Sequence, residues 1–429
     1  MKTAYIADRV FDGETVLTNR AVVVERKTVT GIVPVDSLPA DTKRVVEPSA
    51  TILPGLTDAH IHFMRWEGPL FLAHGVTSVR DTGNRLDWIL QRRTEWPDRP
   101  WPRIWCLGPI LDGPQPAHPL VSVACPDAAA AVAAVQDTAA AGVDGIKLYV
   151  CLEKEWLPAM AARCHEAGLK VSMHCLGTGV QPALQAGVDE FYHLDGVVAD
   201  VWPNPPRGWL SVWGLPEFAA TFDRQQQLAD RIRESGITAT PTLAYWDSQW
   251  RVRRPGYPLA GEAEHVPSRV IDWQGSDGPD PAGSAQWRRA LEAAQKFTGL
   301  LLERKVPVLA GTDVPCGAVP AGLSLWRELS LLCEAGMSPI QALRSATTDV
   351  GAYLNDPNLG RLKPGSPADL VVVGGNPTDK IPEQPDVRLV VRAGTEFRPE
   401  ELLEAAQRDA ATVEDDPWSA QFEMHRRRR

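Results

Sequence analysis

The sequence lacks several features that would indicate a membrane or secreted protein. It has no apolar run near the ~18 residues that a membrane-spanning helix needs, and its N-terminus meets a charged residue too early for a secretion signal. Its seven cysteines are scattered, odd in number and without CxxC spacing, which argues against a disulfide framework. Because reduced cysteines are typical of the cell interior, we expect a cytoplasmic protein without a membrane partner.

An excess of basic residues is also absent. Lysine and arginine together number 44 against 54 aspartates and glutamates, which gives a formal net charge of −10. This balance disfavours a polyanion-binding surface, so we expect no nucleic-acid partner. The 429 residues, 44% of them hydrophobic, can bury one large core and a smaller one. We expect an enzyme that acts on a small molecule and assembles as a homo-oligomer.

Apolar, strand-like runs alternate with helical stretches through the middle of the chain, residues 54–359. The runs are residues 52–58, 77–80, 103–107, 146–150, 170–173, 190–193, 238–243 and 306–310. Residues 127–141 and 154–167 are typical of the intervening helices, and Gly168 follows the second as a helix-ending residue should. Eight strand–helix units predict an α/β fold, specifically a TIM (β/α)8 barrel.

The two ends of the chain have a different character. Residues 1–53 and 360–396 contain short β-like runs broken by glycine and proline. Neither segment can bury its own faces, so we expect the two to pair as one small β-sandwich domain beside the barrel domain. The polar tail, residues 397–429, ends in four arginines, and we expect a frayed helix with a solvated terminus, with a docking or oligomer role as the alternative.

Side chains of metal-ligand type recur where the strand-like runs end, which is where such a barrel holds its catalytic residues. They are His60, His62, His174, His193 and Asp313, and Lys147 lies in the run 145–150. Residues i and i+2 of a strand point to the same face, so His60 and His62 converge on one ion. A bare ammonium cannot bind a cation, so Lys147 joins the site only if its charge is removed. The pattern predicts a metal site at the barrel mouth.

Four segments resemble a known family. Residues 53–62, which contain the first two histidines, and residues 311–313, Gly-Thr-Asp, are similar to the strand-one and strand-eight motifs of the metal-dependent amidohydrolase superfamily. Residues 335–347 and 360–370 resemble its closing helix and return to the small domain. The pattern is nearest to the imidazolonepropionase-like and prolidase-like branch, whose binuclear members carry a carboxylated lysine at the end of strand four.

The resemblance implies a binuclear metal centre. Lys147 would carry a carbamate derived from carbon dioxide that bridges two divalent ions, and burial favours the neutral amine that carboxylation needs. The more buried ion would be held by His60, His62 and Asp313, and the more exposed ion by His174 and His193. Nitrogen and oxygen ligands suit zinc best, with manganese, iron or cobalt as alternatives.

The same resemblance implies hydrolysis of a C–N bond by a metal-bridging hydroxide, since bound zinc lowers the pKa of water to about 7. Asp313 would take a proton on attack and pass it to the leaving nitrogen. His118 is a candidate contact to the carbonyl or oxyanion, although the Gly-Gly-His setting of many relatives is absent. Asp58 would orient a ligand histidine or cap the strand turn.

We expect the substrate to be a dipeptide of Xaa-Pro type or an N-acyl amino acid. A cyclic amide, a carbamate or a urea-type molecule, including a xenobiotic or secondary metabolite, is the enzymatic alternative. A catalytically dead scaffold of the same fold is the alternative outside enzymes.

Further candidates follow from position. Tyr149 shares the inward face of Lys147 and could line the pocket or pack in the core. Arg80 and Asp81, at the end of the second strand, are expected to form a buried ion pair near the mouth.

The segment 201–290 is rich in tryptophan and also carries candidate arginines. Arg251, Arg253 and Arg254 could bind a substrate carboxylate. The seven tryptophans could wall the pocket or anchor long loops. They are Trp202, Trp209, Trp213, Trp246, Trp250, Trp273 and Trp287.

Overall fold

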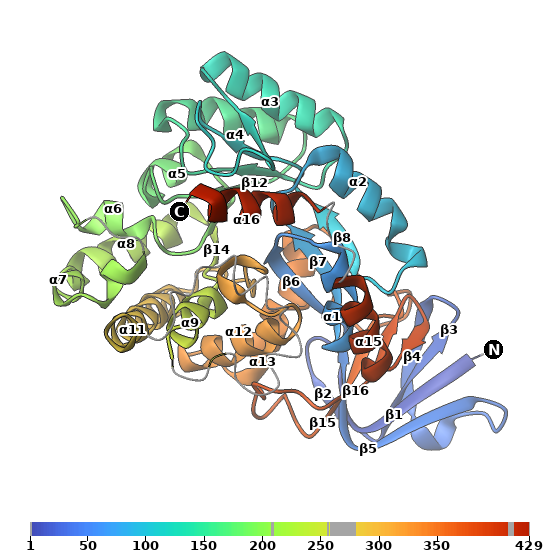
Figure 1. The fold of residues 1–429 in the computed structure, drawn as a ribbon. Coiled ribbons are helices and arrows are strands. Elements are labelled where there is room, and N and C mark those ends of the chain that lie inside the picture. The colour runs from blue at the N-terminus through green and yellow to red at the C-terminus, as the bar shows by residue number, and fades with distance from the viewer. Residues whose placement is uncertain (1, 207–209, 255–256, 258–279, 411–415, 429) are drawn as a thin grey trace.

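The computed structural model describes residues 2–206, 210–254, 257, 280–410 and 416–428. Figure 1 shows a sheet built from both ends of the chain beside a body of parallel strands with helices around it.

The first and last strands of the chain form one sheet. Its order is β17-β16-β15-β5-β1-β3-β4, with β2 paired to β1. The strands are β1 (Lys2–Phe11), β2 (Val16–Thr18), β3 (Arg20–Glu25), β4 (Thr28–Pro34), β5 (Lys43–Pro54), β15 (Leu370–Gly374), β16 (Val387–Arg392) and β17 (Thr395–Phe397). β15 runs antiparallel to β5, with Val372 opposite Ile52, and both side chains lie in a small core of their own. The two β-rich ends are therefore joined by strand pairing.

Parallel strands in two sheets form the middle of the chain. One sheet has the order β6-β7-β8, and the other has the order β10-β9-β11-β12-β13-β14. Their strands are β6 (Leu56–Ile61), β7 (Val76–Asp81), β8 (Arg103–Cys106), β9 (Ile110–Asp112), β10 (Ser122–Ala124), β11 (Ile146–Leu148), β12 (Val171–His174), β13 (Glu190–Tyr192) and β14 (Thr238–Thr240). Most of these strands are buried on both faces, which fits the continuous apolar runs of the sequence, whereas β8 and β10 carry partly buried or exposed residues.

The two parallel sheets approach each other at both edges. At one edge, the amide of Asp144 donates to the Cys106 carbonyl (2.8 Å). At the other, residues 306–314 lie between β14 and β6, where Val308 bridges Ala239 and Val314 bridges Ile61. The predicted α/β class is confirmed. The predicted barrel is not resolved as one continuous sheet among the described residues, because the run 306–310 forms single bridges instead of a regular strand.

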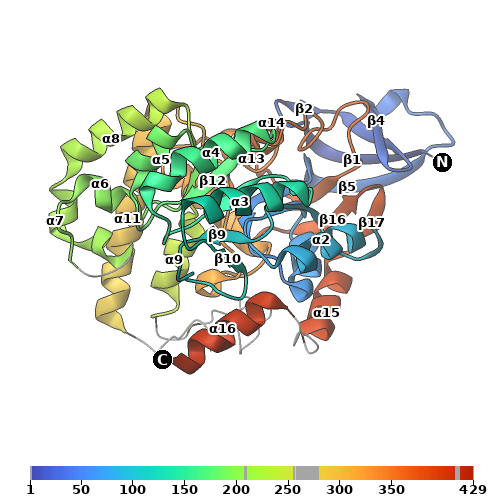
Figure 2. The same cartoon turned by 90° about the horizontal axis from the view of Figure 1, so that it is seen from above.

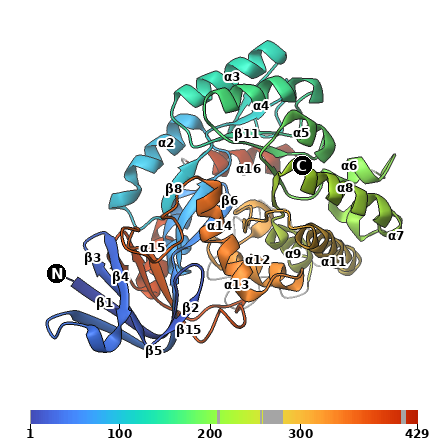
Figure 3. The same cartoon turned by 180° about the vertical axis from the view of Figure 1, so that it is seen from behind.

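Helices surround the parallel strands (Figures 1 and 3). They are α1 (Gly68–Ala73), α2 (Leu86–Glu95), α3 (Ala128–Ala140), α4 (Leu157–Glu166), α5 (Val180–Ala186), α6 (Val197–Val201), α7 (Pro216–Ala219), α8 (Phe222–Ser235), α9 (Leu243–Arg251), α11 (Pro281–Glu303), α12 (Leu323–Glu334), α13 (Pro339–Ser345), α14 (Thr348–Tyr353), α15 (Pro399–Ala410) and α16 (Pro417–Arg428). Gly168 follows α4 with φ of 73°, the left-handed conformation that the sequence predicted there. No helix in the described ranges is long and apolar enough to cross a membrane.

The described part of the C-terminal tail is packed against the body of the protein, so the expectation of a solvated terminus is wrong. Trp418 is 1% exposed, and Asp416 and Gln421 are fully buried. Figure 1 shows α16 crossing in front of the parallel strands, and Figure 2 shows it on the side where β9 and β10 lie. Trp418, Gln421, Phe422 and His425 have the i, i+3, i+4, i+7 spacing of one helix face. The terminal arginines obscured this pattern.

Candidate metal centre

Two strand ends bring His60, His62 and Asp313 together. The Asp313 Oδ1 atom lies 3.2 Å from His60 Nε2 and 3.4 Å from His62 Nε2. Candidate ligand atoms of the three residues all lie within 4.8 Å of one another, and the three residues are buried. His60 lies in β6 and His62 directly follows its last residue, and the Asp313 amide donates to the His60 carbonyl (2.8 Å). Strand periodicity and this backbone bond thus position a group that could hold a metal ion.

His174 and His193 lie next to this group. His174 ends β12 and His193 follows β13, and their ring centroids are 4.2 Å apart. The ring centroid of His193 is also 4.9 Å from that of His60. The Nδ1 atom of His193 lies 2.8 Å from the Thr242 hydroxyl, which orients the ring. The structure therefore brings all four predicted histidines together.

Lys147 of β11 points into the same region. Its side chain is fully buried, and its Nζ atom lies 3.8 Å from the ring centroid of Tyr192 and 5.7 Å from that of Tyr149. Burial lowers the pKa of Lys147 to about 7, although the charges of Asp313 and Glu190 act in the opposite direction. The amine is therefore far more often neutral than a surface lysine.

Several buried nitrogens around this group have no hydrogen-bond partner among the described residues. They are Nδ1 of His60, Nζ of Lys147 and Nδ1 of His174. Each unpaired buried polar group costs ~1–3 kcal/mol, so a cluster of them is unusual unless a ligand occupies them. Imidazole nitrogens and a carboxylate are also the donor types that zinc prefers. The residues present therefore fit a metal centre.

Asp313 is held as an anion in a strained backbone conformation. Burial alone would raise its pKa, but the imidazoles of His193, His60 and His62 outweigh burial and hold the pKa of Asp313 well below its usual range. Asp313, His193 and Thr242 have φ angles of 66°, 59° and 50°. Such conformations cost ~1–3 kcal/mol each in residues other than glycine and cluster at functional sites.

Asp195 is a buried neighbour of the site that the sequence prediction missed. Its Oδ2 atom lies 2.5 Å from His174 Nε2, so Nδ1 of His174 is the nitrogen left for a ligand. Asp195 is only 3% exposed. The dipeptide Asp195-Gly196 resembles an ordinary turn signal. Its position two residues after His193 was the available clue.

Asp58 takes the second of the two roles expected for it. Its Oδ2 accepts a hydrogen bond from the Thr312 hydroxyl (2.7 Å), and its Oδ1 accepts from the amides of Thr312 and His60. Asp58 thus holds Thr312, the residue before Asp313, against β6. None of these bonds orients an imidazole.

His118 and Tyr149 lie beside the histidine group. The Nε2 atom of His118 is 3.1 Å from the Tyr149 hydroxyl, and its Nδ1 atom is 3.3 Å from Nε2 of His425. The Tyr149 ring centroid is 5.0 Å from that of His174. Burial lowers the pKa of His118 to about 3, so its ring is neutral. Tyr149 thus lies between His118 and the candidate ligand His174.

The three candidate arginines contact the outer helices. Arg251 forms ion pairs with Asp247 (2.5 Å) and Glu383 (3.4 Å). The guanidinium of Arg253 lies 5.3 Å from the Trp287 ring centroid, and that of Arg254 lies 4.9 Å from the Trp250 centroid. These contacts are made with α9, α11 and the loop of Glu383, and a substrate role for the three arginines stays a prediction.

The tryptophans that the structure describes in this segment pack mainly against one another. Trp213 and Trp246 are buried with ring centroids 5.2 Å apart, and the Trp287 centroid lies 6.5 Å from that of Trp246. Anchoring of long loops is thus the role that these contacts support. Trp209 and Trp273 lie outside the described residues.

The expected ion pair between Arg80 and Asp81 is wrong. Arg80 pairs with Glu190 (2.6 Å), whereas Asp81 accepts hydrogen bonds from the Phe63 amide and the Asn84 side chain. Adjacent residues of a strand point to opposite faces, so the two side chains cannot meet.

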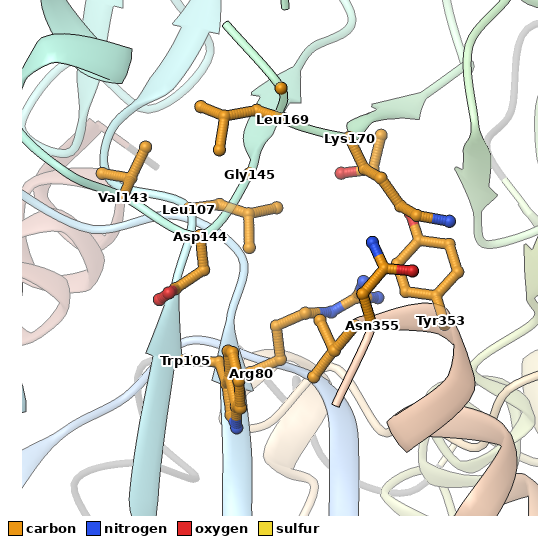
Figure 4. Close-up of a pocket in the computed structure, with 13 residues that line it drawn as sticks. Arg80, Trp105, Leu107, Val143, Asp144, Gly145, Leu169, Lys170, Tyr353 and Asn355 are labelled. Atoms are coloured by element: carbon orange, nitrogen blue, oxygen red, sulfur yellow. The ribbon is translucent and has the colours of Figure 1, made fainter. Parts of the chain in front are cut away.

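A cavity of about 240 Å³ lies at the opposite ends of the strands (Figure 4). Arg80, Lys170 and Tyr353 line it, with Asp144 and Asn355 at its edge. It contains none of the candidate metal ligands, and Lys170 lies over the Tyr353 ring at 4.2 Å.

Residues 288–397 match a family model described as the amidohydrolase family. This stretch includes Asp313 and continues to the last strand of the sheet formed by the chain ends. Within this stretch the chain is similar to amidohydrolase enzymes. The expected enzyme class is therefore confirmed. A comparison with curated protein sequences found no match.

Solved amidohydrolase structures have the same fold over nearly the whole chain. A Xaa-Pro dipeptidase with bound methionine has a TM-score of 0.69 at 20% identity, covering 93% of this chain and 100% of that one. A putative prolidase from Bifidobacterium longum has a TM-score of 0.69 at 22% identity, with coverages of 95% and 99%. A bottromycin amidohydrolase has a TM-score of 0.72 at 25% identity, with coverages of 97% and 91%.

Proposed function

We propose that the protein is a binuclear metal-dependent hydrolase that cleaves the C–N bond of a Xaa-Pro dipeptide or an N-acyl amino acid. The observation that carries the proposal is the buried group of four histidines, Asp313 and Lys147, in which several nitrogens have no partner among the described residues. The similar folds of a Xaa-Pro dipeptidase and a putative prolidase support the substrate class.

The proposal includes the architecture and ligand set expected from the sequence. In this proposal, residues 54–359 form a barrel domain, and residues 1–53 and 360–396 form a small domain beside it. A carbamate on Lys147 would join the four histidines and Asp313 as ligands of two ions, with zinc favoured by the donor set. The buried position of the Lys147 Nζ atom supports this role.

When bound, the ions would activate a water molecule and polarise the scissile carbonyl. Asp313 is placed to accept a proton from the attacking water and to return it to the leaving nitrogen. The oxygen of the water forms a bond to the carbonyl carbon, the C–N bond breaks, and the products are a carboxylic acid and an amine. Thr242 and Asp195 hold the rings of His193 and His174 while this occurs.

A substrate panel tests the proposed reaction. Zinc-loaded protein is incubated with Xaa-Pro dipeptides, N-acyl amino acids, hydantoins and aryl carbamates, and the hydrolysis products are measured by mass spectrometry. We expect turnover of the first two groups, absent in Asp313→Asn. Turnover confined to the hydantoins or carbamates would replace the proposed substrate class. Absence of turnover in all groups would contradict the hydrolase.

A further inference from the structure

The C-terminal helix α16 contacts a predicted metal ligand directly. The ring centroid of Trp418 lies 4.3 Å from that of His62. The Trp418 Nε1 atom donates to the Gly83 carbonyl (2.8 Å), and His62 Nδ1 lies 3.0 Å from the same oxygen. Because a carbonyl only accepts, Nδ1 of His62 carries the proton and Nε2 faces Asp313. One carbonyl therefore fixes both a ligand ring and the tryptophan of α16.

A chain of hydrogen bonds continues from α16 to the site. Gln421 Oε1 accepts from the Leu120 amide (3.0 Å), so its Nε2 is the donor to His425 Nε2 (2.7 Å). His118 Nδ1 lies 3.3 Å from the same His425 nitrogen, whose single lone pair it shares with Gln421, and His118 Nε2 lies 3.1 Å from the Tyr149 hydroxyl. A residue of α16 thus contacts His118 and helps to orient its ring.

The helix is firmly anchored. Arg65 forms an ion pair with the fully buried Asp416 (3.0 Å), and Phe422 is 8% exposed. His62 and His174, each 4% exposed, retain little contact with solvent beside it. Trp418, His118 and Tyr149 form a row of rings beside these histidines: the His118 ring centroid lies 5.1 Å from that of Trp418 and 5.6 Å from that of Tyr149.

We propose that α16 forms one wall of the substrate pocket, in which Trp418 limits the size of the substrate group beside His62 and His425 positions His118. The wall is aromatic, so it suits an apolar or aromatic substrate group. The inference rests on the proposed function and extends it to a segment outside the family match, which ends at residue 397.

The test compares Trp418→Ala with Arg427→Ala, a control on the same helix whose side chain is 76% exposed. The ratio of kcat/KM for Trp-Pro to that for Ala-Pro is measured with zinc-loaded protein. A larger pocket should raise the ratio in Trp418→Ala by at least ~10-fold, the order expected when a pocket changes by a few methylene groups. Arg427→Ala should keep the wild-type ratio.

A second readout needs no turnover. The wall should slow the entry of a chelator, so dipicolinate should remove zinc faster from Trp418→Ala than from wild type or Arg427→Ala. An unchanged substrate ratio together with an unchanged rate of zinc removal would contradict the proposal that α16 forms a wall of the pocket. Failure of the proposed function gives a different result, namely no cleavage of any dipeptide by any variant, and the substrate role of the wall then falls with it.

His425 is tested as a positioning residue. His425→Ala should raise KM for Ala-Pro several-fold with little change in kcat, because His118 loses its orienting acceptor. His425→Gln should recover most of the wild-type KM, since its side-chain oxygen can accept the same hydrogen bond. A wild-type KM in His425→Ala would remove His425 from this role.

Discussion

Two neighbouring polar groups inside the parallel strands differ in how their hydrogen bonds are satisfied. In the first, Arg80 pairs with Glu190, whose Oε1 also accepts from the Thr240 hydroxyl (2.6 Å). The Tyr192 hydroxyl donates to Ser172 (2.7 Å) in the same layer. In the second, around Lys147 and the histidines, nitrogens lack partners among the described residues.

Tyr192 separates the two groups. Its ring lies 3.8 Å from Lys147 Nζ on one side and 5.6 Å from the Arg80 guanidinium on the other. Both groups are equally buried, so burial alone does not distinguish structure from function. In the first group Glu190 Oε2 also lacks a partner among the described residues, but the guanidinium, Oε1 and the hydroxyls pair with one another, so this group stabilises the fold mainly through its own bonds. In the second group the unpaired atoms are nitrogens of metal-ligand type, and a ligand is needed to complete it.

The largest expected effect is on catalysis, in the group around Lys147 and the histidines. Asp313→Asn keeps the size of the side chain but removes the proton acceptor, so kcat should fall by ~10²–10⁴-fold. The melting temperature should stay close to that of wild type. Steady-state kinetics with a cleaved dipeptide and a thermal melt check both. A variant that retains most of its rate would exclude Asp313 as the acid/base.

A substitution in the group of Arg80 and Glu190 should change the stability of the protein instead of its catalysis. Arg80→Met leaves Glu190 as an uncompensated buried charge, which should cost ~3–5 kcal/mol of unfolding free energy. The folded fraction should still bind metal. Urea denaturation and metal analysis of the folded protein measure the two effects. Loss of metal from a fully stable Arg80→Met would break the distinction between the two groups.

Asp195 contacts the group around Lys147 through its hydrogen bond with His174. Asp195→Asn should weaken the affinity for the more exposed ion by ~10–100-fold, because the hydrogen bond that orients His174 is weakened. Competition with a zinc indicator gives the affinity. Equal affinities in wild type and variant would make Asp195 a packing residue only.

Glu328, a buried carboxyl on α12, offers the smallest effect. Burial raises its pKa to about 8, above the ordinary 4.5, so its contribution to stability is full below pH 4.5 and is lost as the pH rises toward 8. Glu328→Gln should flatten the fall in stability between pH 6 and pH 8, since Gln can still accept from the Ala244 amide (2.6 Å). Urea midpoints at those two pH values provide the comparison. A slope as steep as that of wild type would contradict this assignment.

The sequence predicted much of the site because strand chemistry is local. The shared direction of His60 and His62 follows from the period of two in a strand. The places of Lys147, His174 and His193 follow from the apolar runs that contain or precede them. The pairing of Arg80 with Glu190 could not be predicted, because it joins residues 110 positions apart in the chain.

The role of α16 was missed for a similar reason. A polar tail with terminal arginines is usually solvated, and only its contacts with Gly83, Leu120 and His118 show where it docks. The substrate role predicted for the arginines of the tryptophan-rich segment stays a prediction. Charge does not determine the direction of a side chain, and the structure shows two of these arginines in contact with Asp247 and Trp250.

The most direct test of the central claim is metal content per chain, measured by elemental analysis of protein purified without chelator. We predict about two zinc-like ions in wild type, one or none in Lys147→Ala, and about two in the control Lys170→Ala. Acetate or propionate should partly restore the lost ion in Lys147→Ala by replacing the carbamate. Two ions in Lys147→Ala, or none in zinc-supplemented wild type, would contradict the bridged metal centre.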